Sequence, residues 1–221
     1  MKFGIVRFPG TCDDIDAQSA AARVGDATLL WHADRDLKGV DAVIVPGGFS
    51  YGDYLRAGAI ARFAPVMESV VEFAREGGLV LGICNGFQIL CEAGLLPGAL
   101  LRNTSLTFIF RQVALDVVDP VTAFTRACPP RLSIPVKHTT GRYHSDRPVH
   151  VVLRYASGEN PNGSQDDIAG VVNDAGNVFG LMPHPEHAVD PLTGSTDGLT
   201  IFESMAVAVG VRDPAASTAA A

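Results

Sequence analysis

The sequence predicts an α/β protein: a doubly wound parallel sheet with an antiparallel β extension in its second half. Over residues 2–95, short apolar runs alternate with helical patterns, which favours parallel strands with helices on both faces. One run, residues 79–83 (LVLGI), is apolar throughout, as is typical of a strand buried on both faces. In the second half the apolar segments alternate or are β-branched and no long helix separates them, which indicates antiparallel pairing.

In the first half, apolar spacing and turn residues define the elements. Strands are expected over residues 2–7, 28–31, 41–45 and 79–83. Asp13 or Asp14 can cap a first helix, which should run to about Val24. A second helical stretch, 58–76, should divide in two because Pro65 can begin a helix but cannot continue one. A third helix follows the buried strand directly.

The second half is expected to add further strands and a closing helix over 197–209. The strands are expected over residues 106–118, 131–137, 149–155, 168–173 and 177–182. The sequence Asp174-Ala175-Gly176 is typical of a hairpin turn between the last two of them. Because no linker divides the chain, residues 1–210 are expected to form one domain, and the small residues of 211–221 a disordered tail.

Charge and composition disfavour several classes of function. The 17 Lys and Arg against 24 Asp and Glu give a net charge of −7, and the basic residues are scattered, unlike those of general nucleic-acid binders. No apolar run reaches the ~20 residues that span a bilayer, and the N-terminus is typical of a first strand rather than a signal peptide. Four cysteines in such a chain are expected to be reduced thiols in the cytoplasm.

Cys84 stands where the buried strand meets a helix, in Gly82-Ile83-Cys84-Asn85-Gly86. This is the cysteine version of the G-x-S-x-G nucleophile elbow, whose sharp turn exposes the nucleophile at the carboxyl edge of the sheet. The following helix N-terminus favours the thiolate, and the backbone N–H of Asn85 would donate to an oxyanion. The motif alone is equally compatible with a small buried cysteine in a packed turn, which is also the interpretation of Cys91.

The segment Pro183-His184-Pro185-Glu186-His187 predicts a stiff, extended loop after a strand, since its prolines exclude a helix interior and a central strand. On an extended chain His184 and Glu186 project to the same side. They suit a Cys–His–Glu relay in which the histidine takes the thiol proton and the carboxylate stabilises the resulting imidazolium. A plain surface loop, or weak metal binding by His184 and His187, are the alternatives. No further cluster has zinc-site spacing, so no metal is expected. The other histidines are expected in the core or at the surface, with His138 and His144 able to border the site.

Gly47 and Gly48 follow the strand over 41–45, where a glycine pair can bring backbone N–H groups close to a ligand. Gly48 could supply a second oxyanion donor, although the pair alone could be a tight turn. The loop matches neither phosphate-binding fingerprint. The elbow, the histidine loop and the glycine pair each follow a strand of one sheet, where open α/β folds bind ligands. Their joint occurrence favours one catalytic site.

Together, GICNGFQIL, the glycine pair and the PHPE loop resemble the class I (triad) glutamine amidotransferases. More specifically, PGGFSYGDYLRAGAIARFAPVM, FPGTCDDID, LCEAGLLPGALLRN, NGSQDDIAGVVN and GLMPHPEHAVD are similar to segments of the glutaminase subunits of bacterial phosphoribosylformylglycinamidine synthases. The resemblance covers roughly residues 2–209 and implies a flavodoxin-like fold. It implies Cys84 as nucleophile, His184 as base with Glu186 as its partner, an oxyanion hole of Gly48 and Asn85, and glutamine binding by Gln88, Gly47 and Phe49.

The resemblance also implies an activity and partners. Such subunits hydrolyse L-glutamine through a glutamyl thioester and pass ammonia to a large synthetase subunit, and a small third subunit helps to assemble the complex. The synthetase uses ATP and magnesium to convert formylglycinamide ribonucleotide into the amidine, so no cofactor is expected on this chain. The alternatives are a cysteine hydrolase of similar fold and a non-catalytic docking subunit.

Two stretches depart from the family pattern. Residues His138-Thr139-Thr140-Gly141 stand where the family often has Gly-Glu-Gly, which removes a carboxylate and puts any contact made by that loop in doubt. Phe110 stands where the family often has a cysteine, and this exchange is expected to add bulk near the site. Neither departure touches the triad.

Overall fold

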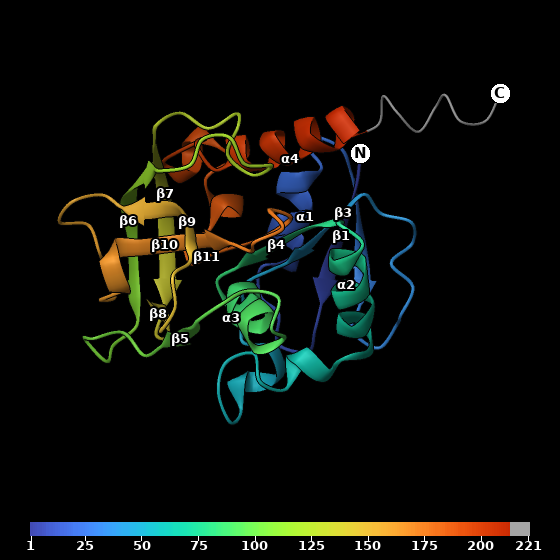
Figure 1. Ribbon diagram of the computed structural model, residues 1–221, viewed down its shortest axis with the longest axis horizontal. Coiled ribbons are helices and arrows are strands. Elements are labelled where there is room, and N and C mark those ends of the chain that lie inside the picture. The colour runs from blue at the N-terminus through green and yellow to red at the C-terminus, as the bar shows by residue number, and fades with distance from the viewer. Residues whose placement is uncertain (213–221) are drawn as a thin grey trace.

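A mixed sheet of nine strands crosses the part of the chain that the computed structural model describes, residues 1–212 (Figure 1). A second sheet has two short strands. The strands are β1 (Lys2–Arg7), β2 (Asp26–Trp31), β3 (Ala42–Val45), β4 (Leu79–Ile83), β5 (Ala99–Leu101), β6 (Ile109–Val117), β7 (Arg131–His138), β8 (Arg142–His144), β9 (His150–Tyr155), β10 (Ile168–Val172) and β11 (Val178–Leu181). The order in the large sheet is β2-β1-β3-β4-β11-β10-β9-β6-β7.

The first half is the predicted doubly wound core. Strands β2, β1, β3 and β4 pair in parallel. The helices are α1 (Asp14–Ala21), α2 (Pro65–Arg75), α3 (Asn85–Glu92) and α4 (Leu199–Arg212). Helix α1 packs on β1, β2 and α4, whereas α2 and α3 pack on β4 from the opposite face (Figure 1). Pro65 is the first residue of α2, as predicted, and a short 3₁₀ turn at Ala61–Phe63 precedes it.

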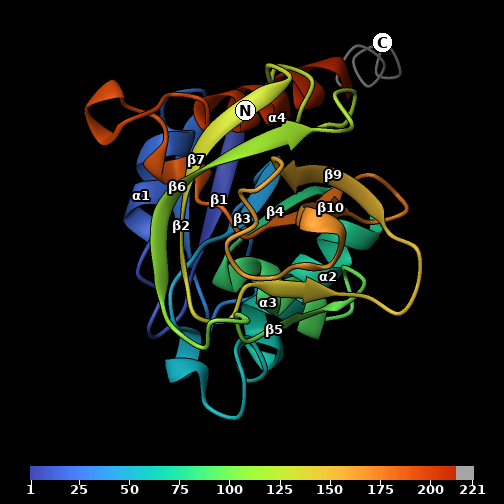
Figure 2. The same ribbon diagram turned by 90° about the vertical axis from the view of Figure 1, so that its left-hand side faces the viewer.

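The second half is the predicted antiparallel extension, with one correction. Strands β10, β9, β6 and β7 pair antiparallel, and Figure 2 shows them with this side of the molecule toward the viewer. Strand β11, however, pairs in parallel with β4 from Val178 to Leu181 and so completes the parallel core. It is also antiparallel to β10 across the predicted hairpin. The expectation that all later strands belong to the extension was therefore wrong for β11, because a hairpin fixes only the pairing of its own two strands.

Strands β5 and β8 of the small sheet were not predicted, since segments of three residues carry too little periodicity. Helix α4 runs to Arg212, two residues into the stretch expected to be a disordered tail, and the rest of that stretch lies outside the described residues. Within residues 1–212 no helix is long and apolar enough to cross a membrane. The core is continuous from the parallel strands into the extension and includes Phe87, Phe124 and Phe179.

Candidate active site

Cys84 lies in the predicted elbow between β4 and α3. Its backbone has φ +50° and ψ −103°, a conformation that non-glycine residues rarely adopt and that marks functional turns. The glycines are required by close packing, because a Cβ atom on Gly86 would lie 1.8 Å from the carbonyl oxygen of Val45. A Cβ on Gly82 would lie 2.9 Å from the carbonyl oxygen of Gly86. The sequence therefore holds Cys84, the predicted nucleophile, in a strained turn on closely packed glycines.

His184 and Glu186 meet as predicted, although the loop that carries them is not extended. Pro185–His187 form the 3₁₀ turn η4, with Pro185 at its first position, where a proline needs no N–H partner. The turn brings Nδ1 of His184 to 2.6 Å from Oε1 of Glu186, and both side chains are buried. The backbone N–H of His184 donates to the carbonyl oxygen of Pro135 at 2.8 Å, which fixes the loop against β7.

The electrostatics of His184 favour its protonated form. Burial alone would lower the pKa of His184, but the charges of Glu186 and of a Cys84 thiolate outweigh burial and raise this pKa to about 10. At neutral pH the imidazolium thus has a carboxylate on its Nδ1 side. The other ring nitrogen, Nε2, has no hydrogen-bond partner at normal distance among residues 1–212. It is left free for a reacting group.

The glycine pair follows β3, and Asn85 directly follows Cys84. The carbonyl oxygen of Gly47 accepts from the backbone N–H groups of Cys12 and Asp13 at 3.2 Å each. Gly48 has φ +143°, and a Cβ there would meet the backbone nitrogen of Cys12 at 2.5 Å. Asn85 is the first residue of α3, so its backbone N–H has no acceptor inside the helix. The oxyanion roles of Gly48 and Asn85 are compatible with this placement and remain predictions.

A cavity at the carboxyl edge of the sheet gathers five of the predicted residues. Its lining comprises Cys12, Asp13, Gly48, Phe49, Asp53, Cys84, Gln88, Phe108, Lys137, His138, Thr139, Thr140 and His184. Gly47, Asn85 and Glu186 do not line it. The Gln88 amide is held at both ends, since its Nε2 donates to the Thr140 carbonyl oxygen at 2.6 Å and its Oε1 accepts from Asn85 at 2.8 Å. Glutamine binding by Gln88, Gly47 and Phe49 therefore remains a prediction.

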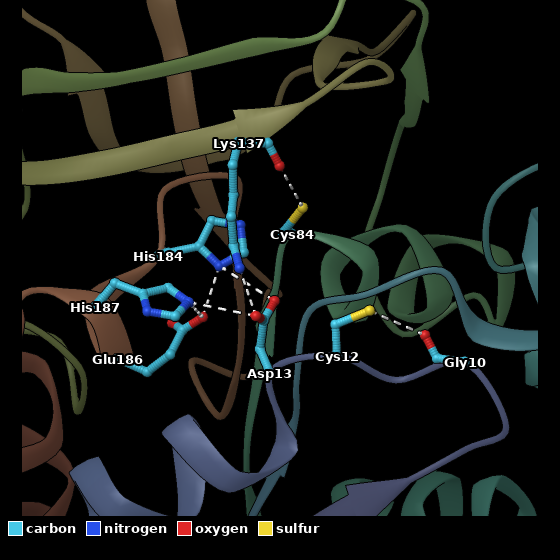
Figure 3. Close-up of polar contacts among 8 residues, drawn as sticks. All are labelled: Gly10, Cys12, Asp13, Cys84, Lys137, His184, Glu186 and His187. Carbon is cyan, nitrogen blue, oxygen red and sulfur yellow. Dashed lines mark hydrogen bonds and ion pairs between the residues drawn. The ribbon is translucent and has the colours of Figure 1, made fainter.

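Sequence reasoning missed Asp13 and Lys137 as site residues (Figure 3). Asp13 occupies the N-cap position of α1, but its side chain makes no capping hydrogen bond. Its Oδ1 lies 2.5 Å from Nζ of Lys137 and 3.3 Å from Nε2 of His187 instead. Burial opposes ionisation of Asp13, yet these partners and the charge of His184 hold its pKa well below the usual range. The only signal in the sequence was that two adjacent aspartates, Asp13 and Asp14, stand where a single one could cap the helix.

The two departures from the family pattern affect the site differently. His138 is buried in the cavity wall, and burial together with the charge of His184 lowers its pKa to about 3, so that it is neutral. Thr140 contributes a backbone carbonyl, so the contact with Gln88 needs no carboxylate. Phe110 is 73% exposed and does not line the cavity, so the expectation of added bulk near the site was wrong. His144 pairs with Asp146 at the surface and does not border the cavity.

The described residues also include three further thiols and one group of candidate metal ligands. All four cysteines are free, and burial raises the pKa of Cys91, which fits its interpretation as a packed residue. Among the described residues, one group could hold a metal ion: Asp13, His184, Glu186 and His187, with ligand atoms within 4.8 Å of one another. The ammonium group of Lys137 already provides a positive charge at Asp13. That the site works without a metal remains a prediction.

The sequence and the fold match known proteins closely. The model of the CobB/CobQ-like glutamine amidotransferase domain matches residues 1–203. Phosphoribosylformylglycinamidine synthase subunit PurQ of Mycolicibacterium paratuberculosis is 61% identical over 216 residues, which are 92% of this chain and 96% of that protein. The same subunit of Rubrobacter xylanophilus is 57% identical over 216 residues, 93% of this chain and 97% of that one.

Solved structures extend the comparison. A chain in the structure of PurLQS from Thermotoga maritima superimposes with a TM-score of 0.89 at 45% identity, covering 92% of this chain and 96% of its own length. A glutamine amidotransferase from Thermotoga maritima has a TM-score of 0.57 at 18% identity, covers 96% of this chain and 94% of its own, and shares the fold alone. The chain therefore belongs to the CobB/CobQ-like glutamine amidotransferase family and, within it, to the PurQ subunits of phosphoribosylformylglycinamidine synthase.

Proposed function

We propose that this chain is the glutaminase subunit of a phosphoribosylformylglycinamidine synthase. It hydrolyses L-glutamine to glutamate and ammonia for the conversion of formylglycinamide ribonucleotide to its amidine in de novo purine biosynthesis. The observation that carries the proposal is the strained Cys84 turn beside the buried His184–Glu186 pair, in a chain 61% identical to a PurQ subunit. All three side chains lie at the carboxyl edge of the sheet, the usual ligand position in this fold class.

In the first chemical step, the Cys84 thiolate attacks the side-chain amide carbon of glutamine and forms a carbon–sulfur bond. The negative charge moves to the amide oxygen, where the backbone N–H groups of Asn85 and Gly48 stabilise it. The His184 imidazolium then gives the proton on Nε2 to the departing nitrogen, the carbon–nitrogen bond breaks, and ammonia leaves. Glu186 keeps the imidazole ring oriented throughout, since its carboxylate holds Nδ1 at 2.6 Å.

In the second step, water hydrolyses the glutamyl thioester. Neutral His184 removes a proton from the water molecule, the oxygen bonds to the thioester carbon, and the carbon–sulfur bond breaks. Glutamic acid leaves and the thiolate–imidazolium pair is restored. No residue changes its oxidation state, and neither step calls for a cofactor on this chain.

The partners follow from the same proposal. The ammonia is delivered to a large synthetase subunit, which uses ATP and Mg²⁺, and a small third subunit completes the complex. The name of the Thermotoga maritima PurLQS structure supports an assembly of this kind. We place the complex in the cytoplasm and treat residues 1–210 as one amidotransferase domain.

The test is Cys84→Ala in the complex reconstituted with both partner subunits. Glutamine-dependent amidine formation should be lost, whereas formation fed by ammonium chloride should stay at the wild-type rate, because the synthetase reaction does not use Cys84. Ammonia release from glutamine, measured with the partners present, should fall at least about a hundredfold, since nucleophile and base act as one unit. Glutamine use at the normal rate by the variant would refute the assignment of Cys84.

The same experiment separates the alternatives. A non-catalytic docking subunit would leave the wild-type complex dependent on ammonium, and Cys84→Ala would change nothing. A cysteine hydrolase of another specificity would not be labelled stoichiometrically at Cys84 by a diazoketone analogue of glutamine. The exposed Cys12 lines the same cavity, so the labelled residue must be identified by peptide mass spectrometry.

A further inference from the structure

Asp13 joins three segments of the chain at the triad. It stands in the loop between β1 and α1, and its side chain is only 4% exposed. Its Oδ1 contacts Lys137 on β7 and His187 on η4, and its Oδ2 lies 3.6 Å from Nδ1 of His184 (Figure 3). The Asp13 carboxylate therefore does not serve as a helix cap. It is buried between the charged Lys137 and His184.

The surroundings are built to admit this carboxylate. A Cβ atom on Gly47 would lie 2.3 Å from Oδ2 of Asp13 and 2.8 Å from Cε1 of His184, so a larger residue at 47 would push the two apart. The carbonyl oxygen of Gly47 also accepts from the backbone N–H of Asp13 at 3.2 Å. The glycine after β3 thus fixes both the main chain and the side chain of Asp13.

The charged and titratable groups around His184 come from four elements. They are Glu186 and His187 on η4, Asp13 before α1, Lys137 and His138 on β7, and Cys84 in the elbow. Of these, His138 is held neutral, and Glu186 pairs with the imidazolium through its hydrogen bond. Asp13 is the second carboxylate near the ring, and Lys137 balances its charge. A buried carboxylate lacking this balance would tend to take up a proton and lose its effect.

We propose that Asp13, held by Lys137, is a positioning residue for the glutaminase reaction: it fixes η4 against β7 and adds a second negative charge beside His184. The inference rests on the proposed function. Asp13 acts through His184 and need not touch the substrate. Its charge favours the imidazolium that protonates the departing amide nitrogen, and its two contacts through Oδ1 hold His187 and Lys137 together at the triad.

The test compares Asp13→Asn with Asp14→Asn in the reconstituted complex. Asp14 is the matched control because it is the adjacent residue, is also buried, and pairs with Arg7 away from the cavity. Asp13→Asn should lower kcat for ammonia release about tenfold, because η4 loses its contact with Lys137 through Asp13 and His184 shifts relative to Cys84. KM should stay within about twofold, because Asp13 acts through the base and not on glutamine binding. The basic limb of the pH profile of kcat/KM should move to lower pH.

Two further variants complete the design. Asp13→Glu keeps the charge and should keep the position of the basic limb even where kcat falls. If Asp13→Asn does not fold, Asp13→Asn combined with Lys137→Met replaces it, since removing both members of a buried ion pair leaves no unpaired charge. A folded Asp13→Asn complex, or its double-variant replacement, with wild-type kcat and an unmoved basic limb would overturn the proposal.

A second readout separates this proposal from the proposed function. The rate at which iodoacetamide alkylates Cys84, followed by peptide mass spectrometry near pH 7, depends on the thiolate–imidazolium pair and not on glutamine. Asp13→Asn should slow it, and Asp14→Asn should not. If the wild-type complex releases no ammonia, the glutaminase assignment fails. In that event an alkylation rate unchanged by Asp13→Asn would also reject the link between Asp13 and His184.

Discussion

Gly86→Ala tests whether the elbow depends on close contact between α3 and β3. The added methyl would lie 1.8 Å from the carbonyl oxygen of Val45, whereas real Cβ atoms essentially never come within 3.0 Å. The start of α3 and the end of β3 must therefore separate by more than an ångström. Because the obstacle is a backbone atom, no rotamer change can relieve it. Overpacking in a core destabilises a protein by about 1–3 kcal/mol, and we expect a loss of about 3 kcal/mol here.

The same displacement should also lower the rate of glutamine hydrolysis. Residue 86 is two positions from Cys84, so a shift of about 1 Å at the helix start moves the sulfur relative to Nε2 of His184, and a misplacement of that size costs about a hundredfold in rate. Glutaminase kcat should fall by roughly this factor. The loss should persist under conditions in which the variant is fully folded.

The free energy of unfolding is measured by urea titration, and kcat by ammonia release in the reconstituted complex. Gly210→Ala is the matched control, because a Cβ there meets nothing within 4 Å and the residue lies in α4. This control should gain about 0.5–1 kcal/mol from helix propensity and leave kcat unchanged. If Gly86→Ala behaved like Gly210→Ala in both assays, the close-contact argument for the elbow would be wrong.

Three other predictions test the base, the core and a departure from the family pattern. Burial alone would lower the pKa of His184, but Glu186 and the Cys84 thiolate raise it to about 10. Ammonia release should therefore persist up to about that pH and fall above it, where the imidazolium loses its proton. Glu186→Gln should move this fall in ammonia release to lower pH. Asn177→Ala removes the side-chain donor to the carbonyl oxygens of Ala74 and Gly78, of which Ala74 keeps the backbone N–H of Gly77, and urea titration should show a loss of about 1–3 kcal/mol in the free energy of unfolding. Phe110→Ala should change that free energy by less than about 0.5 kcal/mol, and ammonia release hardly at all, because the ring is exposed outside the cavity.

The parallel core, the sharp turn at Cys84 and the contact of His184 with Glu186 could be predicted because their signals are local. The apolar run before Cys84 specifies a strand buried on both faces, and the glycines around it specify the sharp turn. His184 and Glu186 are two residues apart, so they can meet on almost any short turn. The prediction of their contact was therefore right although the extended backbone was wrong. Proline spacing excludes a long helix but allows a single 3₁₀ turn.

The rest of the site depends on contacts between distant segments. Asp13 and Lys137 are separated by 124 positions, and nothing in either local sequence indicates that they meet. The parallel pairing of β11 with β4 likewise depends on which strand edge is free once β3 has paired, and hairpin signals do not report this. Phe110 was expected near the site from its place in the family pattern, and strand periodicity could not correct this, because it gives the alternation of faces but not which face is covered.

The free edge of β7 explains why the antiparallel extension belongs to the site. Strand β7 is last in the sheet, so only one of its edges is paired, with β6. On the other edge, the backbone groups of alternate residues form hydrogen bonds outside the sheet. The Ser133 N–H donates to the Asp197 carboxylate, and the Pro135 carbonyl oxygen accepts from the backbone N–H of His184. The Lys137 carbonyl oxygen accepts a hydrogen bond from the Cys84 thiol at 3.8 Å. Pro135 suits this position because a proline lacks the N–H that a paired edge would need.

An open strand edge invites unwanted pairing unless something covers it. Here the loop that carries His184 and the elbow that carries Cys84 contact it, so the contacts that protect the edge also set the position of Cys84 relative to His184. Any change that moves β7 along β6 by one residue would turn Lys137 away from Asp13 and withdraw the carbonyl of Pro135 from His184. The register of the extension, which lies outside the doubly wound core, therefore controls the geometry of the triad.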